Sequence, residues 1–178
     1  IVFFDIETSG FANSADILQL AAKKNRKGSV SKVVDLAWNA SYIQPTQPVV
    51  AAASAVTGLT VVDDELYLND VKVKTISLKE SLENFLKFLR VSPKPSILVA
   101  HNAKFDAKHL KSTIKGFTDT LVLFKKQFLD RKGKGLFKLS QLTKDLLPHR
   151  KTDNFHEAMF DVEILEELVY LLILSLRI

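Results

Sequence analysis

The sequence predicts an α/β fold in which a mixed β-sheet is covered by helices. Three apolar runs, at residues 1–5, 17–22 and 33–43, are typical of successive strands, and the polar turn at 25–28 joins the second to the third. Farther along the chain, short apolar strands alternate with segments of helical period. Strands followed by an alternation of strands and helices are typical of a mixed sheet with helices packed on it.

The elements after the second strand are predicted from alternation and from breaker residues. In the run 33–43 every second residue is apolar and the others are largely polar, so one face is buried and the run is compatible with an edge strand. Pro45 and Pro48 then break the chain. Residues 51–57 favour a helix, and residues 66–73, around Asn69 and Asp70, favour a small hairpin.

The second half of the chain alternates helices and strands. Ser77 and Glu80 form a capping box before a helix whose apolar residues recur at helical spacing. The remaining predicted elements are a strand at 97–100, a helix at 103–114, a strand at 120–123 and helices at 139–146 and 157–176.

Composition limits the classes of protein and of site. A chain of 178 residues with 47% hydrophobic content predicts one domain, residues 1–178, with a sizeable core. The absence of cysteine excludes disulfides, thiolate zinc sites and thiol nucleophiles, and suits an intracellular location without resolving nucleus or cytoplasm. The net charge of +5 favours a polyanionic partner. The apolar tail at 168–174 is shorter than the roughly 20 residues of a membrane span, so we expect no membrane association.

Acidic residues follow two of the predicted strands. Asp5 and Glu7 are two residues apart at the end of the first strand, so both carboxylates leave the same face of the pleat and can share a cation. The alternative is two solvated acids at a strand end. Asp106 falls in the first turn of the helix that follows the strand at 97–100, where an acid can also serve merely as a helix cap.

His156 and Asp161 form a further polar pair near the last predicted helix. They are five residues apart, about 140° around an ideal helix, so they converge only if His156 precedes the helix and Asp161 lies within it. The residues at 152–155 favour a loop at that point. A histidine alone at a helix start is more often a polar surface group.

Taken in order, the segments FDIETSG, TGLT, HNAKFD and HEAMFD resemble the signature of the DEDDh (DnaQ-like) exonucleases over nearly the whole chain. Within that family the layout is most similar to the animal three-prime repair exonucleases and the PML-like exonuclease group, although the polyproline segment of the repair enzymes is missing. The resemblance implies a ribonuclease H-like fold. That fold has a five-stranded mixed sheet, whose second strand is antiparallel, flanked by helices.

The resemblance also implies a chemistry. It implies that Asp5, Glu7, Asp106 and Asp161 are metal ligands and that His156 is the general base. Hard oxygen ligands favour two Mg²⁺ ions, with Mn²⁺ able to substitute. Such a pair supports hydrolysis of phosphodiester bonds. The expected reaction is 3′ to 5′ removal of 5′-mononucleotides from DNA, with single-stranded or frayed 3′ ends preferred.

Substrate contacts are expected around the first two motifs. The resemblance implies contacts from Thr8, directly after Glu7, and from the segment containing Gly58 and Leu59. Phe11 is placed like the apolar wedge of related enzymes and would stack on the terminal bases, unless it is a core residue. Asn102 either contacts substrate or caps the following helix.

Other functions share parts of this pattern. A catalytically silent module that binds nucleic acid or protein would keep the fold, but we would expect it to have lost at least one ligand, and none is replaced. An RNA-directed exonuclease or an endonuclease would share the metal chemistry. The sequence leaves open DNA against RNA, strandedness, processivity and a homodimer formed through an edge strand.

Overall fold

The computed structural model describes residues 1–24, 37–91, 95–110 and 116–175, which form two sheets flanked by helices. The main sheet of this described part has six strands in the order β7-β3-β2-β1-β8-β9. These strands are β1 (Val2–Thr8), β2 (Ile17–Lys24), β3 (Ala37–Ile43), β7 (Thr75–Ile76), β8 (Leu98–Ala100) and β9 (Thr118–Asp119). The helices are α1 (Ala51–Thr57), α2 (Leu78–Arg90), α3 (Lys104–His109), α4 (Thr120–Gln127), α5 (Leu139–Leu146) and α6 (Ala158–Ser175).

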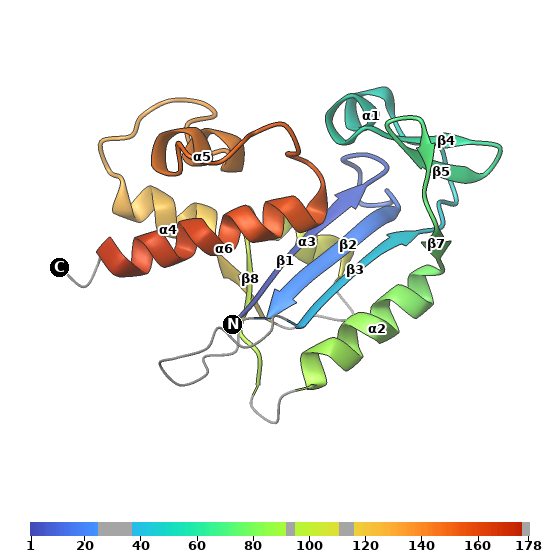
Figure 1. The fold of residues 1–178 in the computed structure, drawn as a ribbon, viewed down its shortest axis with the longest axis horizontal. Coiled ribbons are helices and arrows are strands. Elements are labelled where there is room, and N and C mark those ends of the chain that lie inside the picture. Colours follow the sequence, from blue (N-terminus) through green and yellow to red (C-terminus); the bar gives the residue numbers. More distant parts are fainter. Residues whose placement is uncertain (25–36, 92–94, 111–115, 176–178) are drawn as a thin grey trace.

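Strand β2 alone runs against the other strands of the main sheet. It pairs antiparallel with β1 and with β3, whereas β8 pairs parallel with β1, β9 with β8 and β7 with β3. Figure 1 shows β1 at the centre of the sheet, beneath α6. The predicted mixed sheet with an antiparallel second strand is therefore confirmed.

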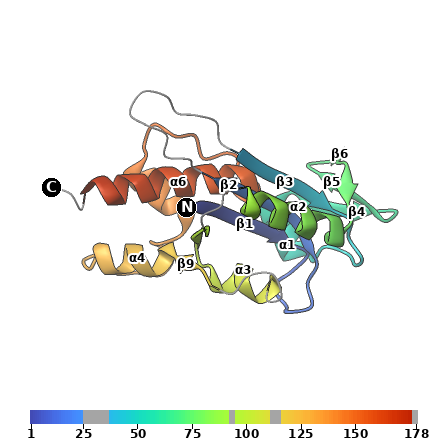
Figure 2. The same ribbon diagram turned by 90° about the horizontal axis from the view of Figure 1, so that it is seen from below.

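Central strand β1 is buried on both faces, as the run of apolar residues at its start predicts. Neighbouring side chains point to opposite faces of a strand. Phe3 accordingly packs with Ala21 and the apolar side of α6, while Phe4 packs in the cluster that contains Phe85 of α2 and Leu110 after α3. In Figure 2, α6 and α3 lie on opposite sides of β1. Helices thus cover both faces and leave the end of β1 open between them.

A second, three-stranded sheet joins α1 to β7. It consists of β4 (Leu59–Val62), β5 (Glu65–Leu68) and β6 (Val71–Lys72), paired antiparallel in sequence order. Each connection is a two-residue turn with positive φ at both positions, namely Asp63 and Asp64 in the first and Asn69 and Asp70 in the second. Such turns favour Asn and Asp. The hairpin predicted around Asn69 and Asp70 is confirmed, and the hairpin at Asp63 was not predicted.

Three predictions about the main sheet need correction. Six strands are described where five were expected, because the short β7 adds to the edge at Tyr42 and Ile43. For the same reason β3 is not the outermost strand there. The predicted strand at 120–123 is wrong: the Asp119 side chain accepts a hydrogen bond from the backbone N–H of Leu121 at 3.0 Å and starts α4 at this point. Parts of the predicted elements at 33–43 and 103–114 lie outside the described residues.

The end of the chain follows the prediction of a helix packed on the core. In α6, Leu168, Val169 and Leu172 are buried, while Leu174 is exposed. Within the described ranges, no helix combines the length and the apolar character that a membrane span requires.

Candidate active site

Strand β1 delivers Asp5 and Glu7 to the face of the sheet that α6 covers. Asp5 is opposite Ala21 and Glu7 is opposite Gln19 in the antiparallel ladder, and Ala21 packs in the α6 cluster. Directly opposed residues share a face, so both carboxyl groups point to the side of α6. The register shifts between Glu7 and Thr8, where regular pairing ends. The two acids therefore lie next to the irregularity at the end of β1.

Asp106 reaches the same point from the neighbouring parallel strand. The chain leaves β8, turns through Asn102 with a positive φ of 59°, and enters α3, whose first turn carries Asp106. The Ile6 N–H donates to Asp106 Oδ1 at 3.3 Å, which ties this carboxyl group to the backbone between Asp5 and Glu7. Asp106 is 2% exposed. It is thus a buried acid held by β1, not a solvated helix cap.

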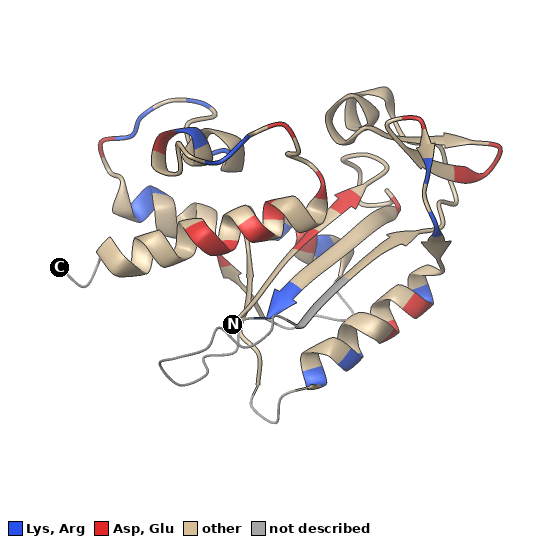
Figure 3. Cartoon of the chain, viewed as in Figure 1, with Lys and Arg blue, Asp and Glu red and all other residues tan. Residues whose placement is uncertain are grey.

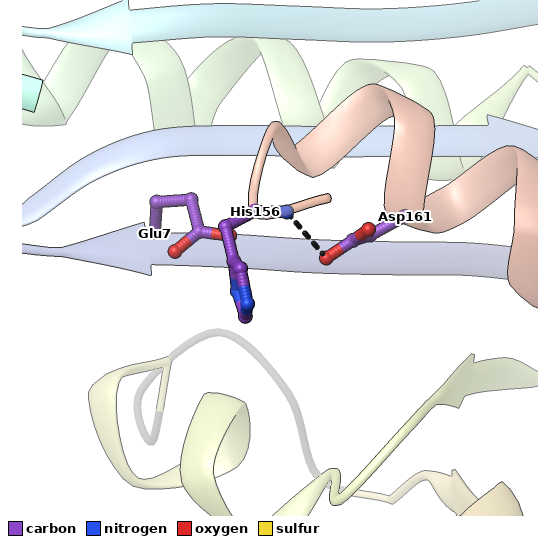
Figure 4. Close-up of side chains that lie close together, drawn as sticks. All are labelled: Glu7, His156 and Asp161. Carbon is purple, nitrogen blue, oxygen red and sulfur yellow. Dashed lines mark hydrogen bonds between the residues drawn. The ribbon is translucent and has the colours of Figure 1, made fainter. Parts of the chain in front are cut away.

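The start of α6 brings His156 and Asp161 together. His156 precedes the helix and Asp161 lies in its first turn, as predicted. The His156 N–H donates to Asp161 Oδ2 at 3.2 Å, and the Asp161 N–H donates to the carbonyl of Glu157 at 3.0 Å. Figure 4 shows the hydrogen bond between His156 and Asp161, and it shows Glu7 on β1 beside the imidazole. Ligand atoms of Glu7, His156 and Asp161 all lie within 4.8 Å of one another.

All five polar residues line one cavity of about 280 Å³ at the end of β1. Thr8, Phe11 and Asn102, the predicted substrate contacts, line it as well. The remaining lining residues are Ile6, Ala53, Val56, Thr57, His101 and Phe105. The structure therefore brings together eight of the ten site residues that the sequence predicts.

Gly58 and Leu59 do not line this cavity. Gly58 ends α1 in the left-handed conformation, with φ 72°, and a Cβ there would lie 2.2 Å from Asn69 Oδ1. Leu59 is 1% exposed and packs with Leu18 and Leu66. A direct contact of Leu59 with substrate stays a prediction, and its side chain does not line the cavity. Both residues fix the end of α1, whose Thr57 does line the cavity.

The crowded carboxyl groups hold protons unusually tightly. Burial first, and then the charges of Asp161 and Asp106, raise the pKa of Glu7 to about 9. Burial likewise raises the pKa of Asp106 and that of Asp161 to about 7, although backbone N–H donors oppose the change in both. Burial and the neighbouring acids also raise the pKa of Asp5 well above its usual range. Positive charge placed among these groups would reverse the effect.

The donor set fits a divalent cation. Asp161 Oδ1 is buried and has no hydrogen-bond partner among the described residues. An unpaired buried carboxylate oxygen is costly. Coordination would satisfy this atom and relieve the repulsion among the acids. Four carboxylates with no thiolate form the kind of hard-oxygen set that Mg²⁺ and Mn²⁺ prefer.

The imidazole of His156 is suited to accept a proton. Desolvation, followed by the charge of Lys138, lowers the pKa of His156 below its usual value. The ring is therefore neutral at neutral pH. His156 lines the cavity and is exposed as a whole residue, so water can reach it.

Phe11 and Val56 form an apolar rim on the opposite side of the cavity. Phe11 is 66% exposed and Val56 is 47% exposed, so the alternative that Phe11 is a core residue is wrong. The Lys108 ammonium donates to the carbonyl of Phe11 at 2.9 Å and lies 4.4 Å from the centre of the Phe105 ring. The loop that carries Phe11 is thereby attached to α3, and its ring is left open to solvent.

His101 also lines the cavity, and the sequence did not single it out. Its Nδ1 lies 3.0 Å from Thr120 Oγ1 and its Nε2 lies 2.8 Å from the carbonyl oxygen of Phe137. The ring thus joins the end of β8 to the loop before α5, next to Lys138. The only signal for His101 was its place at the start of the HNAKFD segment.

Charged residues are unevenly distributed around the cavity. In Figure 3 acidic positions gather where the tip of β1 meets the start of α6, and basic positions occupy α4 and the α4–α5 connection. The basic residues of α4 and this connection are Lys125, Lys126, Arg131, Lys132, Lys134 and Lys138. Arg131 pairs with Asp145. The lysines of this connection therefore form a basic region beside an acidic cavity, a pattern that suits a polyanionic ligand.

Comparison with known proteins gives consistent matches. The model of the RNase_T family, described as exonuclease, matches residues 2–169. The DNA polymerase III PolC-type of Streptococcus pyogenes serotype M2 (strain MGAS10270) is 30% identical over 186 residues, which cover 99% of this chain and 11% of that protein. The corresponding protein of Streptococcus sanguinis (strain SK36) is 31% identical over 182 residues, which cover 97% and 11%. The chain thus spans about a tenth of the length of these curated relatives.

A solved structure supports the fold. Exonuclease X, solved in complex with 5′ overhanging duplex DNA, superposes with a TM-score of 0.61 and 18% sequence identity. The match covers 94% of this chain and 87% of the other. The expected ribonuclease H-like fold is confirmed by this likeness. The narrower resemblance to three-prime repair and PML-like exonucleases stays a prediction.

Proposed function

Because the chain belongs to the RNase_T exonuclease family, we propose that it is a metal-dependent 3′ to 5′ exonuclease that releases 5′-mononucleotides from DNA. Single-stranded or frayed 3′ ends are the preferred substrates, and residues 1–178 act as one exonuclease domain. One observation carries the proposal: four carboxyl groups from β1, α3 and α6 line a single cavity together with His156.

Asp5, Glu7, Asp106 and Asp161 would hold two Mg²⁺ ions, and Mn²⁺ would substitute for them. Bound ions of this kind supply positive charge to the phosphate and to the leaving oxygen, and they favour deprotonation of the attacking water. The unpartnered Asp161 Oδ1 and the raised pKa values of the acids support this assignment.

His156 acts as the general base in this proposal. An imidazole nitrogen accepts the proton of the attacking water, which requires a neutral ring at the working pH. The lowered pKa of His156 supplies that state. The Asp161 carboxyl group accepts from the backbone of His156 and not from its ring, so the ring is free to meet the water.

The 3′ terminal nucleotide is bound by the rim of the cavity. Phe11 stacks on the terminal base, because an exposed aromatic ring packs on any base without sequence preference. Thr8 and Asn102 contact the sugar and phosphate, and Gly58 and Leu59 contribute by holding α1 in place. DNA is proposed as the polymer since the relatives are DNA polymerases and the structural neighbour is a DNA complex.

The test is digestion of 5′-labelled single-stranded DNA and of RNA of the same sequence, each with Mg²⁺ and with EDTA. Asp5→Asn is compared with Asp63→Asn, a matched change at an exposed turn that favours Asn. We expect a Mg²⁺-dependent ladder that shortens from the 3′ end, retained in Asp63→Asn and lost in Asp5→Asn. A ladder with RNA alone would make the chain an RNA exonuclease, and binding without cleavage would overturn the proposal in favour of a silent binding module.

A further inference from the structure

Gln19 is a buried polar residue between Leu18 and Leu20 of β2. It lies in the middle of β2, is 3% exposed and is opposite Glu7 on the face that α6 covers. A buried side-chain amide must satisfy both its donor and its acceptor. Gln19 satisfies both at the start of α6: its Nε2 donates to Glu157 Oε1 at 2.8 Å, and its Oε1 accepts from the Ala158 N–H at 3.0 Å.

Glu157 extends this link through the first turn of α6. Its Oε2 accepts from the Phe160 N–H at 2.9 Å and its Oε1 from the Met159 N–H at 3.3 Å, so its carboxylate caps the helix. Its carbonyl accepts from the Asp161 N–H. Among the described residues, the hydrogen bonds between β2 and the start of α6 are the two that Gln19 makes to Glu157 and Ala158.

His156 directly precedes Glu157 in the chain and has a strained backbone conformation. Its φ is +70°, a left-handed value that is uncommon for residues other than Gly, although Asn, Asp and His adopt it more often than the rest. Such a conformation persists only where the surrounding structure enforces it. The next two residues along the chain, Glu157 and Ala158, are the ones bonded to Gln19. From this left-handed turn the His156 imidazole lies close to Glu7 and Asp161, with one ligand atom of each residue within 4.8 Å of the others.

We propose that Gln19 is a positioning residue for the general base, in that its two hydrogen bonds to Glu157 and Ala158 hold the left-handed turn at His156. The inference rests on the proposed function, because it assigns Gln19 a part in the reaction through His156. Gln19 itself does not line the catalytic cavity.

The chemistry of the pair makes the proposal specific. The neutral amide supplies a donor to Glu157 and an acceptor to the Ala158 N–H from one planar group. Gln19→Glu keeps the size and the acceptor, but it sets a second carboxylate against Glu157. The double variant Gln19→Glu with Glu157→Gln conserves net charge and restores one donor facing one carboxylate. If Gln19 acts by positioning His156, this double variant should therefore recover the kcat that Gln19→Glu loses.

The first test is steady-state digestion of single-stranded DNA. We expect Gln19→Glu to lower kcat by roughly 10-fold to 10²-fold with KM nearly unchanged, since a displacement of about 1 Å in a catalytic group can cost that much. The swapped double variant should recover most of the loss. In a His156→Ala background, Gln19→Glu should change kcat little, because the group it positions is gone. The proposal would be overturned if Gln19→Glu lowered kcat in the His156→Ala background as much as it does in the wild type. It would also be overturned if the double variant had a kcat as low as that of Gln19→Glu alone.

Gln44→Glu is the matched control. Gln44 is an exposed glutamine whose amide also makes two hydrogen bonds, to the Asp64 carbonyl at 2.5 Å and from Thr75 Oγ1 at 2.6 Å, outside the catalytic cavity. The same chemical change there should leave kcat unchanged. A similar fall in kcat at Gln44 would show that an added charge alone, and not the position of Gln19, lowers the rate.

A second readout does not depend on activity. The imidazole resonances of His156, followed by NMR without substrate, should shift in Gln19→Glu and return in the swapped variant. Resonances that stay in place would overturn the positioning role. If the wild-type chain cleaves neither DNA nor RNA, the proposed function fails, and the NMR comparison still decides whether Gln19 orients His156.

Discussion

The clustered acids predict that the metal-free protein loses stability as the pH rises through neutrality. Asp106 and Asp161 have a usual pKa of 3.8, and burial raises both to about 7 in the folded chain. Between those two values the folded chain holds protons that the unfolded chain has already released. A group whose pKa is raised by folding stabilises the fold below its unfolded pKa, and this stability is lost as the pH rises through the folded pKa.

The size of the effect follows from the same values. Each extra proton held by the folded state costs about 1.4 kcal/mol of stability per pH unit. From about pH 5.5 to about pH 7, one such proton amounts to roughly 2 kcal/mol. A change of ~1 kcal/mol moves the Tm of a domain of this size by ~2–4 °C. One such proton therefore lowers the Tm in EDTA by roughly 4–8 °C over that interval, and the expected fall is larger than this because Asp106 and Asp161 both hold one.

Thermal unfolding in EDTA and in Mg²⁺, at a series of pH values, measures this directly. Asp161→Asn has one titrating group fewer, so its Tm should depend less on pH in EDTA. Mg²⁺ should stabilise the wild-type chain more at the higher pH, because the cation binds the deprotonated acids. A Tm in EDTA that is flat or rises over this interval would refute the account of the cavity as a set of repelling buried carboxyl groups.

Three further predictions concern single residues. His156→Ala should lower kcat by about 10²–10⁴-fold in a digestion assay, as expected for loss of a general base, and an unchanged rate would remove it from that role. Phe11→Ala should weaken binding of single-stranded DNA by about 1–3 kcal/mol in a titration while leaving the Tm unchanged, because the ring is 66% exposed; equal affinity would argue against stacking. Gly58→Ala should destabilise the fold by more than ~1 kcal/mol, since φ is +72° and the new Cβ would meet Asn69 Oδ1. Gly116→Ala, where a Cβ meets nothing within 4 Å, is its control, and equal Tm values for the two variants would contradict the argument.

The parts of the site that follow strand and helix periodicity were predictable from the sequence. Asp5 and Glu7 share a face because strand geometry has a period of two, and the loop before α6 was visible in its polar residues. Local signals of this kind are carried by neighbouring residues. They led to the correct placement of His156 before α6 and of Asp161 within it.

Features that depend on distant partners were not predictable in this way. Gln19 forms hydrogen bonds with Glu157 and Ala158, which are separated from it by 138 and 139 positions in the sequence. A local sequence pattern does not predict a contact over that separation. The strand predicted at 120–123 failed because its β-prone residues are overridden by the Asp119 side chain, whose hydrogen bond starts a helix. Likewise, Leu59 was assigned to the substrate from its motif, whereas its burial depends on packing of the small sheet, in which it begins β4, against Leu18 of β2.

The bond from Ile6 to Asp106 and those from Gln19 to the start of α6 span 100 to 139 residues of sequence. During synthesis on the ribosome, β1 with Asp5 and Glu7 emerges before α6, so these acids cannot meet Asp161 until α6 has been made. Until Asp161 has left the exit tunnel, the nascent chain lacks a complete set of ligands. Loop closure over such distances slows folding. In the proposed exonuclease, hydrolytic competence should therefore appear only after α6 has been made and has packed on the sheet.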